Sequence, residues 1–276
     1  MLDVTITSRW AAALRARESQ RPDGLFKDDL ASVLAGPEGT LALEAWEKAN
    51  PRRYEEGANF VAIRVKFFDD LAQRLIAKGV RQVVIPAAGM DARAFRLDWP
   101  ANTTVYEIDH PRLLEIKEQI LKRENAVPKC RRVTVEADLK SDWEELLMDF
   151  GFHAEDPSVW LVEGVLYYFA EETVRQLLGH VSRLAAKGSG FGADLVSTST
   201  LRSPGMQASL KEMEENGIGW KFGSDNPEEF LRQYGWSTKA LQIGEEGANF
   251  GRWTAKVLPR SLENAPRTFL LDAYKD

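Results

Sequence analysis

The chain has 276 residues, and its 42 acidic and 36 basic side chains give a net charge of −6. This balance is unfavourable for a nucleic-acid partner, because proteins that bind nucleic acid normally present a basic surface. Apolar residues make up 44% of the chain, enough for the core of one large domain. No stretch approaches the ~20 consecutive apolar residues of a membrane span, so we expect no membrane segment. Residues 1–20 lack the apolar run of a signal peptide.

The cysteine and histidine content limits the chemistry further. Cys130 is the only cysteine, which excludes an internal disulfide and fits a reducing, cytoplasmic location. His110, His153 and His180 are not spaced as paired ligands on one helix, so we expect no histidine-based metal site. Composition leaves a magnesium site made only of carboxylates open.

The first part of the chain predicts helices. Residues 9–20 and 41–50 predict short helices, separated by a Pro-Asp-Gly turn at residues 22–24. Residues 59–78 predict a longer helix, because apolar side chains recur there at steps of three and four residues.

Strands and helices then alternate. Short apolar runs predict strands over residues 82–89, 103–109, 131–138, 158–164 and 190–197. Helices are expected between them over residues 111–124, 141–150 and 171–186, the second opened by a capping box of Ser141 and Glu144. Strands joined by helices predict a parallel sheet covered on both faces, an α/β fold.

The pattern loosens after residue 198. We predict a helix near 203–216, a short helix near 227–233, and strands over 238–243 and 266–273. The whole chain, residues 1–276, is expected to form a single domain. It would carry an N-terminal helical lid over residues 1–58 and a cap insertion over residues 198–235.

Small or acidic residues follow four successive predicted strands. In open parallel sheets, ligands bind beyond the carboxyl ends of the strands. Each such residue alone has an ordinary explanation, such as a turn glycine or a helix cap, but their coincidence favours a ligand site. The residues are Ala87, Gly89, Asp91, Glu107, Asp109, Asp138, Leu139 and Glu163.

An acid about 20 residues after a turn glycine suits a ribose diol, so we expect the ligand at this edge to contain a ribose. Asp109 stands at that distance from Gly89. Nicotinamide dinucleotides and S-adenosylmethionine both contain a ribose, so this feature does not separate them. The turn lacks G-x-G-x-x-G, and Asp91 within it would repel a pyrophosphate but suits an ammonium and a sulfonium. No P-loop and no G-x-S-x-G elbow occurs.

Four segments together resemble the leucine carboxyl methyltransferase superfamily. They are VVIPAAGMDARAFRLDWP with VYEIDHP, then VEGVLYYF at residues 162–169, Ala137-Asp138-Leu139, and AIRVKFFDD around Arg64. The N-terminal AALRARESQRPDGLFKDDLA resembles the large bacterial branch, which includes polyketide carboxyl-methylating enzymes. The resemblance extends over about residues 8–270.

The resemblance implies a class I methyltransferase fold, which is Rossmann-like, with seven strands and an antiparallel last strand. It also implies S-adenosyl-L-methionine as cofactor. By the same resemblance, Arg64 would bind the cofactor carboxylate and Gly89 would lie under the methionine part. The other implied contacts are Asp109 to the ribose, Asp138 and Leu139 to the adenine, and Glu163 to the ammonium.

Two departures from the family pattern concern the cofactor turn and the substrate. Ala87 stands where the family has the first glycine of the turn. The N-terminal lysine of the leucine-methylating enzymes has no clear match, and Arg15 and Arg17 are the nearest basic candidates for substrate binding.

The acceptor side offers aromatic candidates but no evident base. Tyr167, Tyr168 and Trp220 are candidates for substrate binding. No catalytic residue is assigned. A carboxylate acceptor is already anionic and needs no general base, whereas an alcohol or phenol would need one.

The sequence therefore predicts an O-methyltransferase acting on a carboxylate or hydroxyl of a small molecule. A nicotinamide-dependent oxidoreductase is the alternative enzyme, and a non-catalytic nucleoside-binding module of the same fold is the alternative of another class. A nucleic-acid methyltransferase is disfavoured by the acidic charge and by the lack of an Asn/Asp-Pro-Pro-Tyr motif. The sequence does not indicate the oligomeric state.

Overall fold

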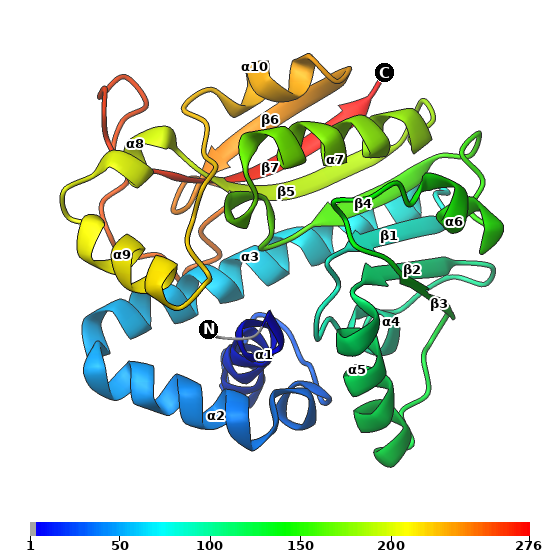
Figure 1. Ribbon diagram of the computed structural model, residues 1–276, viewed down its shortest axis with the longest axis horizontal. Coiled ribbons are helices and arrows are strands. Elements are labelled where there is room, and N and C mark those ends of the chain that lie inside the picture. The colour runs from blue at the N-terminus through cyan, green and yellow to red at the C-terminus, as the bar shows by residue number, and fades with distance from the viewer. Residues whose placement is uncertain (1–3) are drawn as a thin grey trace.

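A computed structural model of the protein, which describes residues 4–276, contains a seven-stranded sheet in the order β3-β2-β1-β4-β5-β7-β6 (Figure 1). Six strands share one direction, and β7 runs antiparallel to both of its neighbours. This arrangement confirms the predicted sheet with its antiparallel last strand. The strands are β1 (Gln82–Pro86), β2 (Thr104–Asp109), β3 (Arg131–Glu136), β4 (Ser158–Val162), β5 (Gly190–Val196), β6 (Trp236–Gln242) and β7 (Thr268–Lys275).

Helices cover both faces of the sheet. Successive strand residues point to opposite sides, so the apolar strands present buried side chains to both faces. Val83 and Ile85 pack with α3 (Pro51–Ala77) and α5 (Pro111–Arg123) in one core. Val84 packs in the second core, which the helices of the other face close. Those helices are α6 (Glu144–Asp149), α7 (Glu171–Leu184) and α10 (Pro227–Arg232).

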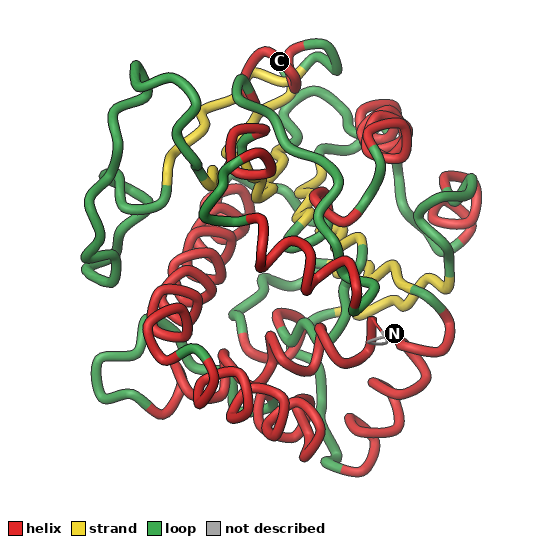
Figure 2. The backbone as a smooth tube through the Cα atoms, turned by 60° about the vertical axis from the view of Figure 1, so that its left-hand side comes forward, coloured by secondary structure: helices red, strands yellow, loops and turns green. Residues whose placement is uncertain are grey.

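An N-terminal pair of helices lies beside the sheet. Helices α1 (Val4–Gln20) and α2 (Ala31–Ala49) pack against each other and against α3, the long helix that Figures 1 and 2 show running from this pair to the sheet. Helix α2 begins ten residues earlier than predicted. Gly36, with φ of 60°, and Pro37 kink it, and this interruption masks the helical pattern of its first part.

Two other helix predictions are wrong in detail. Helix α3 begins at Pro51 instead of residue 59, because its first turns are polar and carry no apolar periodicity. The helix expected over 203–216 is two helices, α8 (Thr198–Arg202) and α9 (Gln207–Glu215), separated around Pro204. Proline has no N–H to donate and disfavours the helical conformation of the residue before it.

The capping box at the start of α6 is also wrong. The Ser141 hydroxyl donates to the backbone oxygen of Asp138 instead of accepting from a helical N–H. Trp143 occupies the N-cap position, without a side-chain cap. Strands β6 and β7 lie two residues away from their predicted starts.

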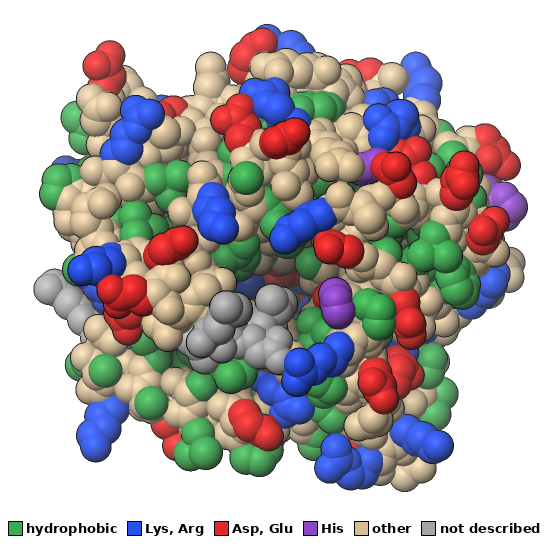
Figure 3. All heavy atoms as spheres, in the orientation of Figure 1, with side chains coloured by type: hydrophobic (Ala, Val, Ile, Leu, Met, Phe, Trp, Pro, Cys, Tyr) green, Lys and Arg blue, Asp and Glu red, His purple; other side chains and the backbone are tan. Residues whose placement is uncertain are grey.

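The surface in Figure 3 carries acidic and basic side chains side by side, and on the described part of this face neither sign forms a continuous patch. Among residues 4–276, the helices are all too short or too polar to cross a bilayer.

Helix α3 approaches the sheet closely because β5 contains glycines. A Cβ built on Gly192 would lie 2.9 Å from two ring carbons of Phe68 and 3.1 Å from Leu71. Phe68 and Leu71 are both buried on α3, so they have little room to move. The glycine therefore sets the distance between α3 and the sheet.

We expect Gly192→Ala to lower the free energy of unfolding by about 1–3 kcal/mol, the usual effect of overpacking a core. Gly205→Ala is the matched control, because a Cβ there meets only the Ser203 hydroxyl oxygen, at 3.8 Å. Thermal unfolding measures both variants. Equal stability of the two would contradict the proposed close contact.

Candidate active site

The turn after β1 and the end of β2 are joined by the Asp109 carboxylate. Its Oδ2 accepts a hydrogen bond from the Gly89 N–H at 2.7 Å, and its Oδ1 accepts one from the His110 N–H at 2.7 Å. Burial raises the pKa of Asp109, and these two N–H groups oppose that effect. Gly89 has φ of 50°, and a Cβ there would lie 3.1 Å from Cβ of Ser8, so α1 lies directly over this turn.

Arg64 lies at the carboxyl ends of β4 and β5, where α3 passes them. Its Nε donates to Oε1 of Glu163 at 3.0 Å, and its Nη1 donates to Oδ2 of Asp194 at 3.1 Å and to the Tyr167 hydroxyl at 3.3 Å. The other oxygen of Asp194 accepts the Gly164 N–H at 2.6 Å. The guanidinium is thus fixed from β4, β5 and the 3₁₀ turn at Leu166–Tyr168.

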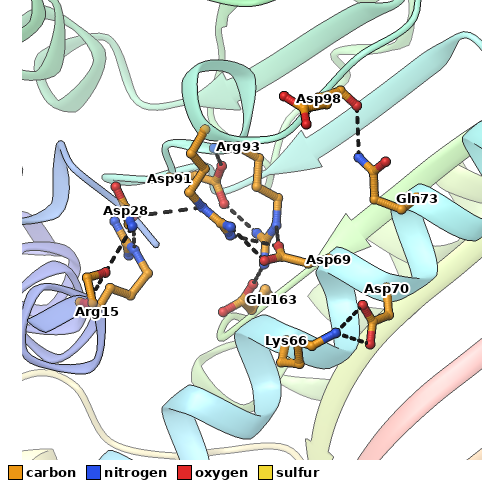
Figure 4. Close-up of polar contacts among 12 residues, drawn as sticks. Arg15, Asp28, Lys66, Asp69, Asp70, Gln73, Asp91, Arg93, Asp98 and Glu163 are labelled. Carbon is orange, nitrogen blue, oxygen red and sulfur yellow. Dashed lines mark hydrogen bonds and ion pairs between the residues drawn. The ribbon is translucent and has the colours of Figure 1, made fainter. Parts of the chain in front are cut away.

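A second arginine, Arg93, lies beside it at the start of α4 (Arg93–Arg96) and is 1% exposed. Its Nε donates to Asp69 Oδ1 at 2.8 Å and its Nη2 to Glu163 Oε2 at 2.7 Å (Figure 4). Its Nη1 donates to the Asp91 carboxylate. Glu163 therefore has one arginine on each carboxylate oxygen.

These cations determine the charge state of the neighbouring acids. Burial raises the pKa of Glu163, but the attraction of Arg93 and Arg64 outweighs burial, and the pKa lies below its usual value. Burial also raises the pKa of Asp91, but the attraction of Arg93 and of other cations outweighs burial and lowers the pKa to about 2. Both acids are negatively charged at neutral pH. Within residues 4–276, no three His, Cys, Asp or Glu side chains are grouped to hold a metal ion.

Glu107 is placed differently from the other predicted residues. It is 0% exposed, and its Oε2 accepts from Lys117 at 2.6 Å and from Arg132 at 2.7 Å. A ligand at the edge of the sheet has no access to this carboxylate. We therefore assign Glu107 a structural role and do not keep it among the proposed cofactor contacts.

Asp138 and Leu139 follow β3 and lie on the same edge of the sheet as Asp109. The Asp138 carboxylate accepts the Lys140 N–H at 3.0 Å, and Leu139 is buried in the core below. The Ala137 N–H donates to the backbone oxygen of Asp109 at 3.0 Å, which holds this loop to the end of β2.

The two predicted substrate arginines on α1 diverge. Arg15 reaches the turn after β1, where it donates to the Met90 carbonyl and, at 2.9 Å, to Asp28. Arg17 points to the other helices, where it pairs with Glu47 and with the Tyr54 hydroxyl at 2.7 Å. The structure therefore brings Arg15, and not Arg17, to the candidate site.

Three aromatic rings form a wall next to Arg64. The ring centroids of Tyr167 and Tyr168 are 4.7 Å apart, and those of Tyr167 and Trp220 are 4.9 Å apart. The Lys221 N–H donates to the Tyr167 carbonyl at 2.6 Å, which fixes the Trp220 segment to this wall. Burial raises the pKa of both tyrosines, so their hydroxyls stay protonated at neutral pH.

Arg93, Asp69 and Asp194, which the structure places in the network of arginines and carboxylates, are not among the residues expected from the sequence. Asp194 lies within GFGADLV, an apolar strand that is buried throughout. A lone acid in such a strand needs a partner, so this signal was present in the sequence. Arg93 and Asp69 carry no comparable local signal, because their partners are distant in the chain.

The fold and the site define the class of Rossmann-like methyltransferases. The sequence profile of the family described as leucine carboxyl methyltransferase matches residues 8–182. A protein from Frankia alni, assigned by name to the S-adenosyl-L-methionine-dependent methyltransferases, is 38% identical over 262 residues, which cover 90% of this chain and 88% of that protein.

Solved structures share the fold. One is a DUF574 family protein from Streptomyces avermitilis, with a TM-score of 0.60 at 13% identity, covering 98% of this chain and 97% of that one. Another, from Thermobifida fusca and named for methyl transfer, has a TM-score of 0.57 at 19% identity, covering 97% and 94%.

The chain belongs to the leucine carboxyl methyltransferase family. It is an S-adenosylmethionine-dependent methyltransferase, which decides between the two cofactors that the ribose-binding pattern left open.

Ala87 adopts a conformation that favours glycine. Its φ is 54°, a left-handed value in which a Cβ approaches the following carbonyl oxygen. The family pattern has glycine at this position. The methyl group therefore strains the turn.

We expect Ala87→Gly to raise the free energy of unfolding by about 0.5–1 kcal/mol, because relief of strain exceeds the added freedom of the unfolded chain. Ala88→Gly is the control. Ala88 is 5% exposed and has no positive φ, so its loss should destabilise the protein. Thermal unfolding of both variants tests this, and destabilisation by Ala87→Gly would contradict the assigned strain.

Proposed function

We propose that this protein transfers the methyl group of S-adenosylmethionine to a carboxylate oxygen of a small molecule. The observation that carries the proposal is the aromatic wall of Tyr167, Tyr168 and Trp220 beside Arg64, whose polar groups are two hydroxyls and an indole N–H and include no carboxylate or imidazole. Tyr167 and Tyr168 both have raised pKa values, so at neutral pH they donate hydrogen bonds and do not act as bases. His110, the histidine that directly follows Asp109, has an exposed side chain, and we do not assign it as a general base.

The residues at the edge of the sheet fit the proposed cofactor. Each oxygen of Asp109 accepts one N–H and keeps a second lone pair, which suits the two ribose hydroxyls. The hydrogen bonds of Arg64 leave its Nη2 uncommitted among the described residues, which suits the carboxylate of the methionine part. Gly89 and Gly164 both have positive φ and present no side chain here.

The remaining cofactor contacts follow from the same edge. Glu163 and Asp91 are negatively charged and suit the ammonium, while Asp138 and Leu139 suit the adenine. Once bound, the cofactor supplies a methyl group activated by its sulfonium. The protein then has to align the acceptor oxygen and exclude water.

Trp220 and the two tyrosines would bind the acceptor. The indole N–H of Trp220 is buried and has no hydrogen-bond partner among the described residues. An indole N–H and two hydroxyls can hold a carboxylate against aromatic rings. Arg15 is the basic candidate from α1.

Residues 1–58 and 198–235 would close over the two ligands as lid and cap. For the lid, the contacts of Ser8 with Gly89 and of Arg15 with Met90 support this role. For the cap, the support is the bond of the Trp220 segment to Tyr167. A reducing, cytoplasmic setting suits Cys130, whose pKa burial raises to about 11.

We expect Asp109→Asn to weaken binding of S-adenosylhomocysteine about tenfold or more, because a hydrogen bond to a charged group contributes about 1.5–3 kcal/mol. Glu107→Gln is the control. It removes a charge next to buried Lys117, so it should lower the melting temperature and leave the affinity within about twofold of wild type. Calorimetric titration measures both, and unchanged affinity in Asp109→Asn would exclude the ribose assignment.

We expect carboxylic acids to be converted to methyl esters, and their alcohol analogues not to be converted to methyl ethers, in a screen followed by mass spectrometry. The rate should be flat between about pH 6 and 9, because the acceptor is ionised and both tyrosines stay protonated throughout this range. A rate that rises with pH, or a preference for hydroxyl acceptors, would overturn the carboxylate assignment.

A further inference from the structure

Arg93 connects three carboxylates from three parts of the fold. Asp69 comes from α3, Asp91 from the turn after β1, and Glu163 from the end of β4. Each of the three arginine nitrogens is used by a different acid (Figure 4). One planar group therefore fixes the relative positions of two acids at the edge of the sheet.

The cation lies behind the acids instead of among them. The side chain of Arg93 is 2% exposed, whereas those of Asp91 and Glu163 are 13% and 14% exposed. At its back, Asp69 is held by Arg96 through two hydrogen bonds of 2.6 and 2.7 Å. This bidentate pair anchors the network, so that Arg93 presents Asp91 and Glu163 toward a ligand.

We propose that Arg93 is a positioning residue, which orients the carboxylates of Glu163 and Asp91 and thereby sets the affinity for the cofactor. This inference rests on the assignment of both acids to the cofactor site under the proposed function. Arg93 itself is sealed from the ligand and acts through the two acids.

Glu163 faces charged groups from every element packed against it. Arg64 on α3 and Arg93 on α4 attract it, while Asp91 in the turn and Asp194 on β5 repel it. The Tyr167 hydroxyl, on the 3₁₀ turn, meets it through Arg64. Arg93 is the stronger of the two attractions.

Removing Arg93 leaves the effect of burial less opposed, so the pKa of Glu163 rises. A group with a raised pKa takes up its proton as the pH falls, and a protonated Glu163 no longer attracts an ammonium. Loss of Arg93 should therefore make cofactor binding depend on pH, with weaker binding on the acidic side.

Calorimetric titration with S-adenosylhomocysteine at several pH values between about 5.5 and 7 tests the proposal, because the amino group of this probe stays protonated and its carboxyl group stays ionised there. We expect wild type to change less than twofold over this range. Arg93→Met should bind about tenfold more weakly at pH 5.5 than at pH 7. Arg93→Lys keeps the positive charge but not the planar guanidinium with its several donors. It should restore an affinity that does not change with pH, at a value between those of wild type and Arg93→Met.

Arg132→Met is the matched control, since Arg132 is an arginine on β3, with a side chain 9% exposed, that pairs with Glu107 and Glu118 away from the site. It should lower the melting temperature without creating a pH dependence. A pH-independent loss in Arg93→Met, or no loss, would overturn the proposal and leave Arg93 a structural residue.

A double-mutant cycle keeps the proposal testable if Arg93→Met does not fold. Glu163→Gln removes one of the two charges that Arg93 orients, so adding Arg93→Lys should then cost less affinity than the same change costs in wild type. Additive losses would contradict the proposal. All these measurements report cofactor binding, so they stand even if no carboxylic acid is methylated, a result that would refute only the acceptor assignment.

Discussion

The site depends on a buried network of arginines and carboxylates that ties α3 and α4 to the ends of β4 and β5. Arg64 and Arg93 share Glu163, and Asp194 and Asp69 hold the two arginines from opposite sides. Removing such charges from water is costly, and each is tolerable only because it is paired and hydrogen-bonded. The network in turn requires α3 to lie close to β5, where Gly192 leaves space for Phe68. The packing of α3 against β5 therefore also determines where the proposed cofactor-binding charges lie.

The sheet was predictable because its signal is local. Each of the five parallel strands before residue 198 is a short apolar run followed by a helix, and the structure has all five. The failures occur where local signals mislead. The kink at Gly36 and Pro37 hides the first part of α2, and Pro204 divides a segment whose composition suits one helix. Ser141 and Glu144 match a capping box, but the Ser141 hydroxyl bonds to Asp138 instead.

Reasoning from strand ends predicted the acids of the candidate site and the turn glycine Gly89, whereas Arg64 was expected only from the resemblance to the family. The rule that ligands bind beyond strand ends finds Asp91, Asp109 and Glu163 without any knowledge of their partners. It also includes Glu107, because sequence alone does not show that this carboxylate faces Lys117 and Arg132. The arginine partners were not predictable in the same way, since Arg64 and Glu163 are 99 residues apart and Arg93 and Glu163 are 70 apart. Such pairs follow from the packing of α3 and α4.

The two halves of the proposed site, one for the cofactor and one for the acceptor, are built differently, and this has consequences for specificity. The cofactor half consists of strand ends and paired charges, in which any change leaves a buried ion without a partner. The acceptor half consists of aromatic rings and a chain segment held to Tyr167 by backbone hydrogen bonds, which do not depend on side-chain identity. Substitutions at Trp220 and around it can therefore alter the acceptor pocket without disturbing Arg64 or Glu163. On this physical ground, proteins of this fold can keep one cofactor while they differ in the acceptors they bind.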